Sequence, residues 1–142
     1  MTIPSDRRTE LLAAAPLFAD VDAAGLERIA ARTVEVEFTP GHVIARQGEI
    51  GTGFFLIASG RAKVVRDGRE TASLGPGEFF GELSILDGKP RTAQVVAAES
   101  TVCLALASWD FEAVLLANPA LTLAILRGVA SRLREATEAV RH

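Results

Sequence analysis

The sequence GELSILDGKPRTA, residues 81–93, brings a glycine, one acidic side chain and one arginine within reach of a single small ligand. A short helix that opens at Gly81 would leave its first amide groups without intrahelical partners, and the helix dipole adds partial positive charge there. A phosphate bound at this end gains hydrogen bonds, and Arg91 supplies a full positive charge. The stretch therefore predicts an anion-binding pocket.

Glu82 indicates a second ligand group beside the anion. A bare carboxylate that faced a phosphate would be repelled, so we expect Glu82 to accept a hydrogen bond from a hydroxyl. A phosphate and a hydroxyl at this separation describe the ribose phosphate of a nucleotide better than a free inorganic anion.

Two runs in this region, Phe80–Ser84 and Pro90–Ala93, look like the phosphate-binding cassette of cyclic nucleotide-binding domains. Such domains occur in catabolite activator proteins, cyclic-nucleotide-dependent kinases and gated channels. An earlier stretch, Pro40–Glu49 followed by Phe54–Ile57, resembles the first β-turns of the same family. The resemblance rests on two separated motifs in the right order.

The resemblance implies a role for each part of the cassette. Glu82 would accept the ribose 2′-hydroxyl, and Arg91 would grip the phosphate with its planar guanidinium. Thr92 would touch the phosphate, and a threonine there also suits a guanine base in the syn conformation. Cyclic AMP is favoured and cyclic GMP is possible. Backbone amides are expected from Gly81, Leu83 and Ser84.

The same residues also have plain structural interpretations. Arg91 could be a solvated loop arginine, the usual environment of this residue type. Glu82 could be a favourable acid in the first turn of a short helix, and Thr92 a β-branched residue that starts a strand.

The C-terminal helix carries apolar residues at alternating steps of three and four, which is a heptad pattern. This seam predicts a parallel homodimer, with Leu121 and Ile125 on a neighbouring stripe packed against the rest of the domain. The alternative is that the seam itself packs on the domain. The seam residues are Leu126, Val129, Leu133, Ala136 and Val140.

Aligned with catabolite-activator-like proteins from Asn118, the helix places Ala136 and Thr137 where that family has a base-contacting polar pair. The resemblance implies that Thr137 contacts the purine edge, from its own or the partner subunit, whereas Ala136 lacks the hydroxyl. An exposed helix position is the alternative for Thr137. The expected ligand-binding residues are thus Gly81, Glu82, Leu83, Ser84, Arg91, Thr92, Ala93 and Thr137.

The remaining pattern predicts a mainly β domain with flanking helices (α+β). We expect one cyclic nucleotide-binding domain over residues 1–142, with N-terminal helices in 5–31, a β-roll in 33–107 and C-terminal helices in 109–141. The roll would have about eight short antiparallel strands, because alternating apolar runs are separated by glycine turns. The expected strands cover residues 33–38, 43–46, 54–59, 62–66, 71–74, 92–97 and 101–106.

Local signals refine these elements. Ser5 or Asp6 is expected to cap a first helix that runs to about residue 15, and Asp20 or Asp22 to cap the second. Val34, Val36 and Phe38 are expected to face inward from a strand whose glutamates face solvent. The Asp67–Gly68 pair predicts a hairpin.

Composition limits the function classes. With 142 residues, 49% hydrophobic, and a net charge of -3 the chain fits one soluble domain and disfavours non-specific nucleic-acid binding. The N-terminus lacks an apolar signal segment and Cys103 has no disulfide partner, which favours a cytoplasmic location. No segment reaches the ~20 apolar residues of a membrane span.

Catalytic and metal sites are not indicated. His42 has no cluster of metal-ligand residues around it in the sequence, and no nucleophile has a visible base partner. Cys103 is expected to be an inert buried thiol. The four phenylalanines that invite a stacking role are expected to pack in the core: Phe54, Phe55, Phe79 and Phe80.

These observations predict a binding module without enzymatic activity: a stand-alone or regulatory cyclic-nucleotide sensor that acts on an unidentified effector. One alternative is the sensor half of a transcription regulator that lacks its DNA-binding domain. Another is a degenerate roll used for dimerisation or scaffolding, against which the intact Glu82 and Arg91 count. A metal-dependent β-barrel enzyme would need a ligand cluster. Because the sequence ends at His142, directly after the helix, we expect no effector domain on this chain.

Overall fold

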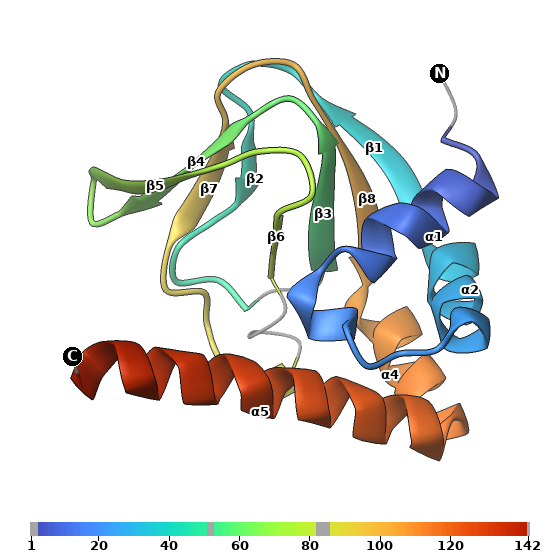
Figure 1. Cartoon of the computed structure of the whole chain (residues 1–142). Helices are drawn as coiled ribbons and strands as arrows, with labels where there is room; N and C mark the ends of the chain where they lie inside the picture. Colours follow the sequence, from blue (N-terminus) through green and yellow to red (C-terminus); the bar gives the residue numbers. More distant parts are fainter. Residues whose placement is uncertain (1–2, 51–52, 82–85, 142) are drawn as a thin grey trace.

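The computed structural model describes residues 3–50, 53–81 and 86–141, with the side chains of 140 and 141 left out. A β-roll lies beside an N-terminal helical layer, and a long helix runs along one end of both (Figure 1). The helical elements are α1 (Ser5–Ala13), the 3-10 turn η1 (Pro16–Phe18), α2 (Ala23–Arg32), α4 (Ser108–Ala117) and α5 (Pro119–Arg141).

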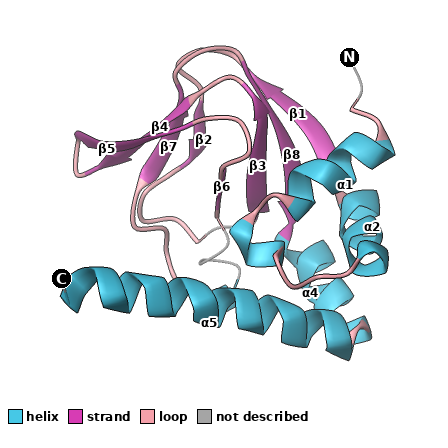
Figure 2. Ribbon diagram, in the orientation of Figure 1, coloured by secondary structure: helices cyan, strands magenta, loops and turns pink. Residues whose placement is uncertain are grey.

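The roll consists of two four-stranded antiparallel sheets, in the orders β1-β8-β3-β6 and β2-β7-β4-β5 (Figure 2). This architecture confirms the predicted fold class. The strands are β1 (Val34–Phe38), β2 (Val43–Ala45), β3 (Gly53–Ser59), β4 (Ala62–Arg66), β5 (Arg69–Leu74), β6 (Phe79–Phe80), β7 (Gln94–Ala97) and β8 (Thr101–Ala107).

Two hydrophobic clusters fill the domain. The larger one lies between the helices and the first sheet, where the ring of Phe18 meets those of Phe54 and Phe111 edge-on. The smaller one contains residues of both sheets, including Ile57, Val95 and Cys103. The four phenylalanines expected in the core all pack: Phe54 and Phe80 are buried, and Phe55 and Phe79 are half-buried.

The N-terminal helix differs from the prediction at both ends. Pro4 precedes it in extended conformation, its carbonyl accepts the amide of Arg8 at 3.0 Å, and no side chain caps the helix, so neither Ser5 nor Asp6 is the cap. The helix ends at Ala13, two residues early, because a residue before proline avoids the helical region. Ala15 accordingly has a ψ of 127°.

Two other local predictions are confirmed. Asp22 caps α2, since its carboxylate accepts the amide of Gly25 at 2.8 Å. Asp67 and Gly68 form the β4–β5 turn with positive φ angles of 52° and 79°, as a two-residue type I′ hairpin requires. Gln47 fixes this turn, because its side-chain amide donates to the Asp67 carboxylate and its carbonyl accepts the Asp67 amide.

β1 follows the predicted alternation only in part. Val34 is 61% exposed, whereas Glu35 is half-buried and its carboxylate accepts the amide of Ile3. The N-terminal segment therefore covers Glu35 on the face that was predicted to be wet, whereas Glu37 on the same face is exposed. The short strand β6 was not predicted, because two phenylalanines give no period to detect.

Among the described residues, no single helix is long and apolar enough to cross a membrane. Helix α4 and residues 119–139 of α5 are together long and apolar enough for a membrane span, but the two helices meet at an angle of 116°.

Gly60 generates a stability prediction. Its φ is +91°, and an added Cβ would overlap the Ser100 carbonyl oxygen and lie 2.7 Å from the Thr101 Cα atom. Gly41 has nearly the same φ, +85°, with nothing within 4 Å. Gly41→Ala should cost about 1–2 kcal/mol of unfolding free energy through backbone strain alone. Gly60→Ala should cost about 3 kcal/mol or more, because strand backbone must also move.

Urea denaturation of both variants measures these free energies. Equal losses for Gly60→Ala and Gly41→Ala would show that the backbone approach at Gly60 carries no energetic weight.

Candidate functional site

Gly81 lies directly after β6, where the chain approaches the backbone of β3. Its φ is +95°, and an added Cβ would overlap the carbonyl oxygen of Gly53 and lie 3.0 Å from Nη1 of Arg91. A residue with a side chain is thus disfavoured here both by conformation and by space. The glycine allows three segments to meet at one point.

Arg91 is held at this point through its side chain and its backbone. Its Nη2 atom donates to the carbonyl oxygen of Gly53 at 2.9 Å. Its backbone carbonyl accepts a hydrogen bond from the Gly48 amide at 2.9 Å, and its backbone amide donates to the backbone carbonyl of Glu49 at 2.8 Å. The half-buried guanidinium is therefore preorganised, so little conformational entropy remains to be lost when an anion binds.

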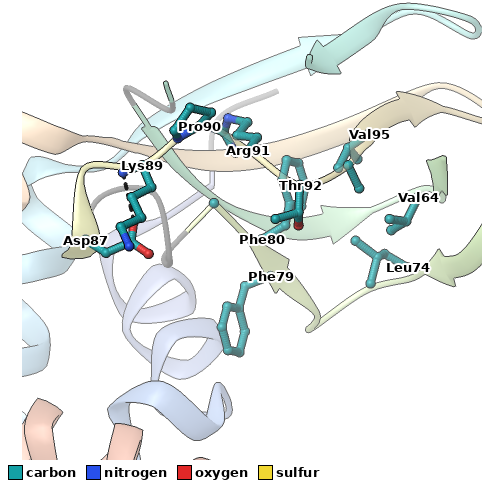
Figure 3. Close-up of a pocket in the computed structure, with 12 residues that line it drawn as sticks. Val64, Leu74, Phe79, Phe80, Asp87, Lys89, Pro90, Arg91, Thr92 and Val95 are labelled. Atoms are coloured by element: carbon teal, nitrogen blue, oxygen red, sulfur yellow. Dashed lines mark hydrogen bonds between the residues drawn. The ribbon is translucent and has the colours of Figure 1, made fainter. Parts of the chain in front are cut away.

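A cavity of about 510 Å³ opens beside these residues, between the two sheets (Figure 3). Gly81, Lys89 and Arg91 lie at its polar end. The opposite wall is apolar and comes mainly from three strands of the second sheet, through Val64, Leu74 and Val95. The cavity can thus hold an anionic group at one end and a flat apolar group at the other.

The segment before Arg91 adds a second positive charge. Lys89 lines the cavity, and its backbone amide donates to the carboxylate of Asp87 at 2.9 Å (Figure 3). This hydrogen bond closes a short turn that directs the chain toward Pro90 and Arg91. Among the lining residues that the structure describes, two cationic side chains and one carboxylate give a net positive charge.

The comparison with known families shows which family this chain belongs to. The family profile of the cyclic nucleotide-binding domain matches residues 35–118, more than half of the chain. This chain belongs to the cyclic nucleotide-binding domain family. The resemblance inferred from the two sequence motifs is therefore confirmed.

Several relatives and solved structures are similar to this cyclic nucleotide-binding domain. A cyclic nucleotide-gated potassium channel of Rhizobium etli is 38% identical over 80% of this chain and 32% of its own length. A CRP-like cAMP-activated global transcriptional regulator of Mycobacterium tuberculosis is 36% identical over 88% of this chain and 58% of its own length. The chain thus spans about one third to three fifths of these relatives.

Among solved structures, the N-terminal domain of a transcriptional regulator from Streptomyces coelicolor superimposes with a TM-score of 0.80 and 36% identity, covering 91% of this chain and 93% of that one. The Thermus thermophilus catabolite activator protein gives a TM-score of 0.74 and 34% identity, covering 89% and 62%. Both comparisons agree with the observed roll and long C-terminal helix.

The structure brings four of the predicted ligand-binding residues together in the wall of one cavity: Gly81, Arg91, Thr92 and Ala93. Glu82, Leu83 and Ser84 lie outside the described residues. Thr137 is exposed on α5, is not among the cavity-lining residues, and its hydroxyl donates to the carbonyl of Leu133 at 2.9 Å. Its predicted contact with the base stays a prediction.

The apolar wall of the domain's cavity was missed from the sequence. Val64, Leu74 and Val95 come from three separate strands, and each looks like an ordinary strand residue. Their shared orientation depends on the sheet order β7-β4-β5, which no local pattern encodes. Apolar positions on neighbouring strands were the only signal available.

The predicted seam of α5 is split by the structure. Leu126 is 58% exposed, Leu133 is 67% exposed, and Ala136 is exposed as well. Val129 is half-buried and packs against the domain's own core, while the Val140 side chain lies outside the described part. As expected, Leu121 and Ile125 are buried in that core.

Metal and thiol chemistry find no support in residues 3–50, 53–81 and 86–141. No group of three or more His, Cys, Asp or Glu side chains there is placed to hold a metal ion. Cys103 is fully buried in the smaller core cluster, and burial raises the pKa of its thiol from 9.0 to about 12.

The Cys103 thiol should therefore stay unreactive in the folded domain. At pH 8 a thiol-directed reagent should label it only at the rate of unfolding. Since the unfolded thiol ionises near pH 9 and the folded one near pH 12, stability should fall as the pH rises between these values. Cys103→Ala should lack this component. Rapid native-state labelling would contradict the inert assignment.

Proposed function

We propose that this chain is a cyclic-nucleotide sensor module that binds a cyclic nucleotide monophosphate at the Gly81–Ala93 segment. The observation that carries the proposal is the meeting of Gly81 and the Arg91 guanidinium on the Gly53 carbonyl, at the polar end of an amphipathic cavity. The cyclic phosphate would lie at this end, and the base would lie along the apolar wall.

The size and chemistry of the cavity support this ligand. A volume of about 510 Å³ is within the ~300–1,000 Å³ typical of small-molecule sites. An inorganic phosphate would leave the wall formed by Val64, Leu74 and Val95 without a partner. A nucleotide uses both ends, because its base buries apolar surface while its phosphate accepts hydrogen bonds.

The finer assignments within the segment are proposed from the resemblance of its motifs to the family. Glu82 is proposed to accept the ribose 2′-hydroxyl, and the amides of Leu83 and Ser84 to bind the phosphate together with Gly81. Thr92 lines the cavity and is exposed, so its hydroxyl can reach either the phosphate or a base. Ala93 contributes wall surface.

The preferred base is proposed to be adenine. The names of similar proteins include both cyclic nucleotides. One is a cAMP-activated regulator of Mycobacterium tuberculosis, and another is a cGMP-dependent protein kinase of Toxoplasma gondii that is 41% identical over 49% of this chain. Thr137 lies on α5 and does not line the cavity of its own chain. Its exposed position suits contact with the base of a ligand bound to a second copy of the chain.

A parallel homodimer through α5 is part of the proposal. Leu123, Leu126 and Leu133 are 47%, 58% and 67% exposed, and with Ala130 and Thr137 they follow steps of three and four along one stripe. This stripe shares Leu126 and Leu133 with the seam predicted from sequence but does not include Val129, which packs against the domain's own core. Pairing of two α5 helices would bury these exposed leucine side chains.

The proposed role is regulation by binding, without catalysis, in the cytoplasm. A ligand changes the output only through its different affinity for two states of the domain. The effector that reads this state is unidentified. The match to the N-terminal domain of a Streptomyces coelicolor transcriptional regulator favours a DNA-binding output as a second candidate, although the net charge of -3 gives this part no nucleic-acid footprint.

Calorimetric titration with cyclic AMP and cyclic GMP tests the ligand and the role of Arg91. Arg91→Ala should weaken binding more than tenfold, since losing one partner of a partly desolvated charge pair costs about 2–5 kcal/mol. Arg28→Ala is the matched control, because Arg28 is exposed on α2 and does not line this cavity. A hundredfold excess of ligand over its Kd should add about 2.7 kcal/mol to the unfolding free energy.

If neither nucleotide binds the unmodified domain, the sensor proposal fails. If Arg91→Ala binds as tightly as Arg28→Ala, the nucleotide binds elsewhere.

Sedimentation equilibrium at micromolar concentration tests the dimer. Leu126→Glu or Leu133→Glu should give a monomer, because two like charges would face each other in a parallel pair. Leu116→Glu serves as the control: Leu116 is 80% exposed but lies on α4, outside the stripe. A monomeric parent domain, with and without nucleotide, would rule out this interface.

A further inference from the structure

The turn of the β4–β5 hairpin is held from outside by the side chain of Gln47. The side-chain amide of Gln47 donates to the Asp67 carboxylate at 2.8 Å, and its side-chain carbonyl accepts the Asp67 backbone amide at 3.0 Å. Residues 66–69 are all exposed, so little packing supports this turn. A pair of hydrogen bonds to one residue fixes both the distance and the orientation of the turn relative to Gln47.

Gln47 lies in the loop that holds Arg91. The next residue of this loop, Gly48, donates its backbone amide to the Arg91 carbonyl at 2.9 Å. The Glu49 carbonyl accepts the Arg91 amide at 2.8 Å. These two bonds pair the loop with the Arg91 segment as neighbouring antiparallel strands are paired. A displacement of the loop therefore displaces Arg91 as well.

The same hairpin carries part of the apolar wall of the cavity. Val64 lies on β4, and Leu74 lies at the end of β5. Residues 69–73 of β5 are exposed, and among the described strands β5 pairs with β4 and lies at the edge of its sheet. An edge strand has a neighbour on one side only, so the contact with Gln47 adds a restraint that packing does not supply.

We propose that Gln47 is a positioning residue that tethers the β4–β5 hairpin to the loop holding Arg91, and so keeps the apolar wall at a fixed distance from the anion-binding end. Gln47 is exposed and does not line the cavity, so it acts through other residues. The effect on affinity rests on the proposed function, in which the phosphate meets Arg91 and the base meets Val64 and Leu74. A ligand that contacts two elements binds best when both are already in the bound arrangement.

Amide hydrogen exchange without ligand tests the tether itself. Gln47→Ala removes both bonds to Asp67 and should speed exchange of the Asp67, Gly48 and Arg91 amides about two- to tenfold, the factor by which one hydrogen bond changes an equilibrium. Gly41→Ala is the control for a general loss of stability, because its added Cβ meets nothing within 4 Å. Unchanged exchange at Gly48 and Arg91 in Gln47→Ala would overturn the proposal.

A double-mutant cycle on the affinity for cyclic AMP identifies Asp67 as the partner. Gln47→Glu places a second carboxylate against that of Asp67 and should weaken binding about three- to tenfold. In an Asp67→Asn background the same change should weaken binding at least about threefold less, because the asparagine amide can donate to the new carboxylate. The charge added at position 47 is the same in both backgrounds, so its long-range repulsion of the phosphate cancels. Equal effects in the two backgrounds would show that the proposal is wrong.

Nucleotide titration of the neutral variants then separates this proposal from the proposed function. Gln47→Ala should lower the affinity for cyclic AMP about three- to tenfold, while Gly41→Ala should stay within about twofold of the parent domain. Faster exchange with unaltered affinity would overturn the positioning role and leave the sensor function intact. If the parent domain binds no nucleotide, the sensor function fails together with the effect on affinity, and exchange at Gly48 and Arg91 still decides whether Gln47 tethers the two parts.

Discussion

The carbonyl oxygen of Gly53 is the point on which the ligand-binding end of this domain depends. It accepts a hydrogen bond from the Arg91 guanidinium and lies where a side chain on residue 81 would be. Because Gly81 has none, the chain after β6 comes close enough to place its backbone beside the guanidinium. The backbone bonds from Gly48 and to Glu49 hold Arg91 from the other side. The proposed anion site is thus held in place by hydrogen bonds of the protein itself, which lowers the entropic cost of binding.

The rest of the fold gives the proposed site an apolar wall that suits the base of a nucleotide. The order of the second sheet places β4, β5 and β7 side by side, so that one apolar residue from each faces the cavity. The first sheet carries β6 and, on its other face, packs against the helices. Ligand cavity and helical layer therefore share β6, and Arg132 on α5 reaches that strand through Phe79.

What the sequence could predict was local. The Asp67–Gly68 turn and the Asp22 cap depend on a few neighbouring residues, and both were correct. The cap at Ser5 or Asp6 was wrong because Pro4 already starts the helix. Gly81, Arg91, Thr92 and Ala93 were proposed as site residues from motifs, and the structure places them in the wall of one cavity. The hydrogen bond from Arg91 to Gly53, which joins residues 38 positions apart, could not be predicted from those motifs. Val129 shows the same limit: heptad spacing placed it on a seam, whereas its burial depends on how α5 packs on the core.

The most direct test of this account compares Gly81→Ala with Gly88→Ala by calorimetric titration with cyclic AMP, under conditions where melting shows both variants folded. Both glycines have positive φ, +95° and +68°, but only at Gly81 would a Cβ meet another atom within 4 Å. Gly81→Ala should weaken binding more than about tenfold, because the displaced backbone separates from Arg91, while Gly88→Ala should stay within about threefold of the parent domain. Equal affinities for the two variants would contradict the claim that close packing on Gly53 creates the site.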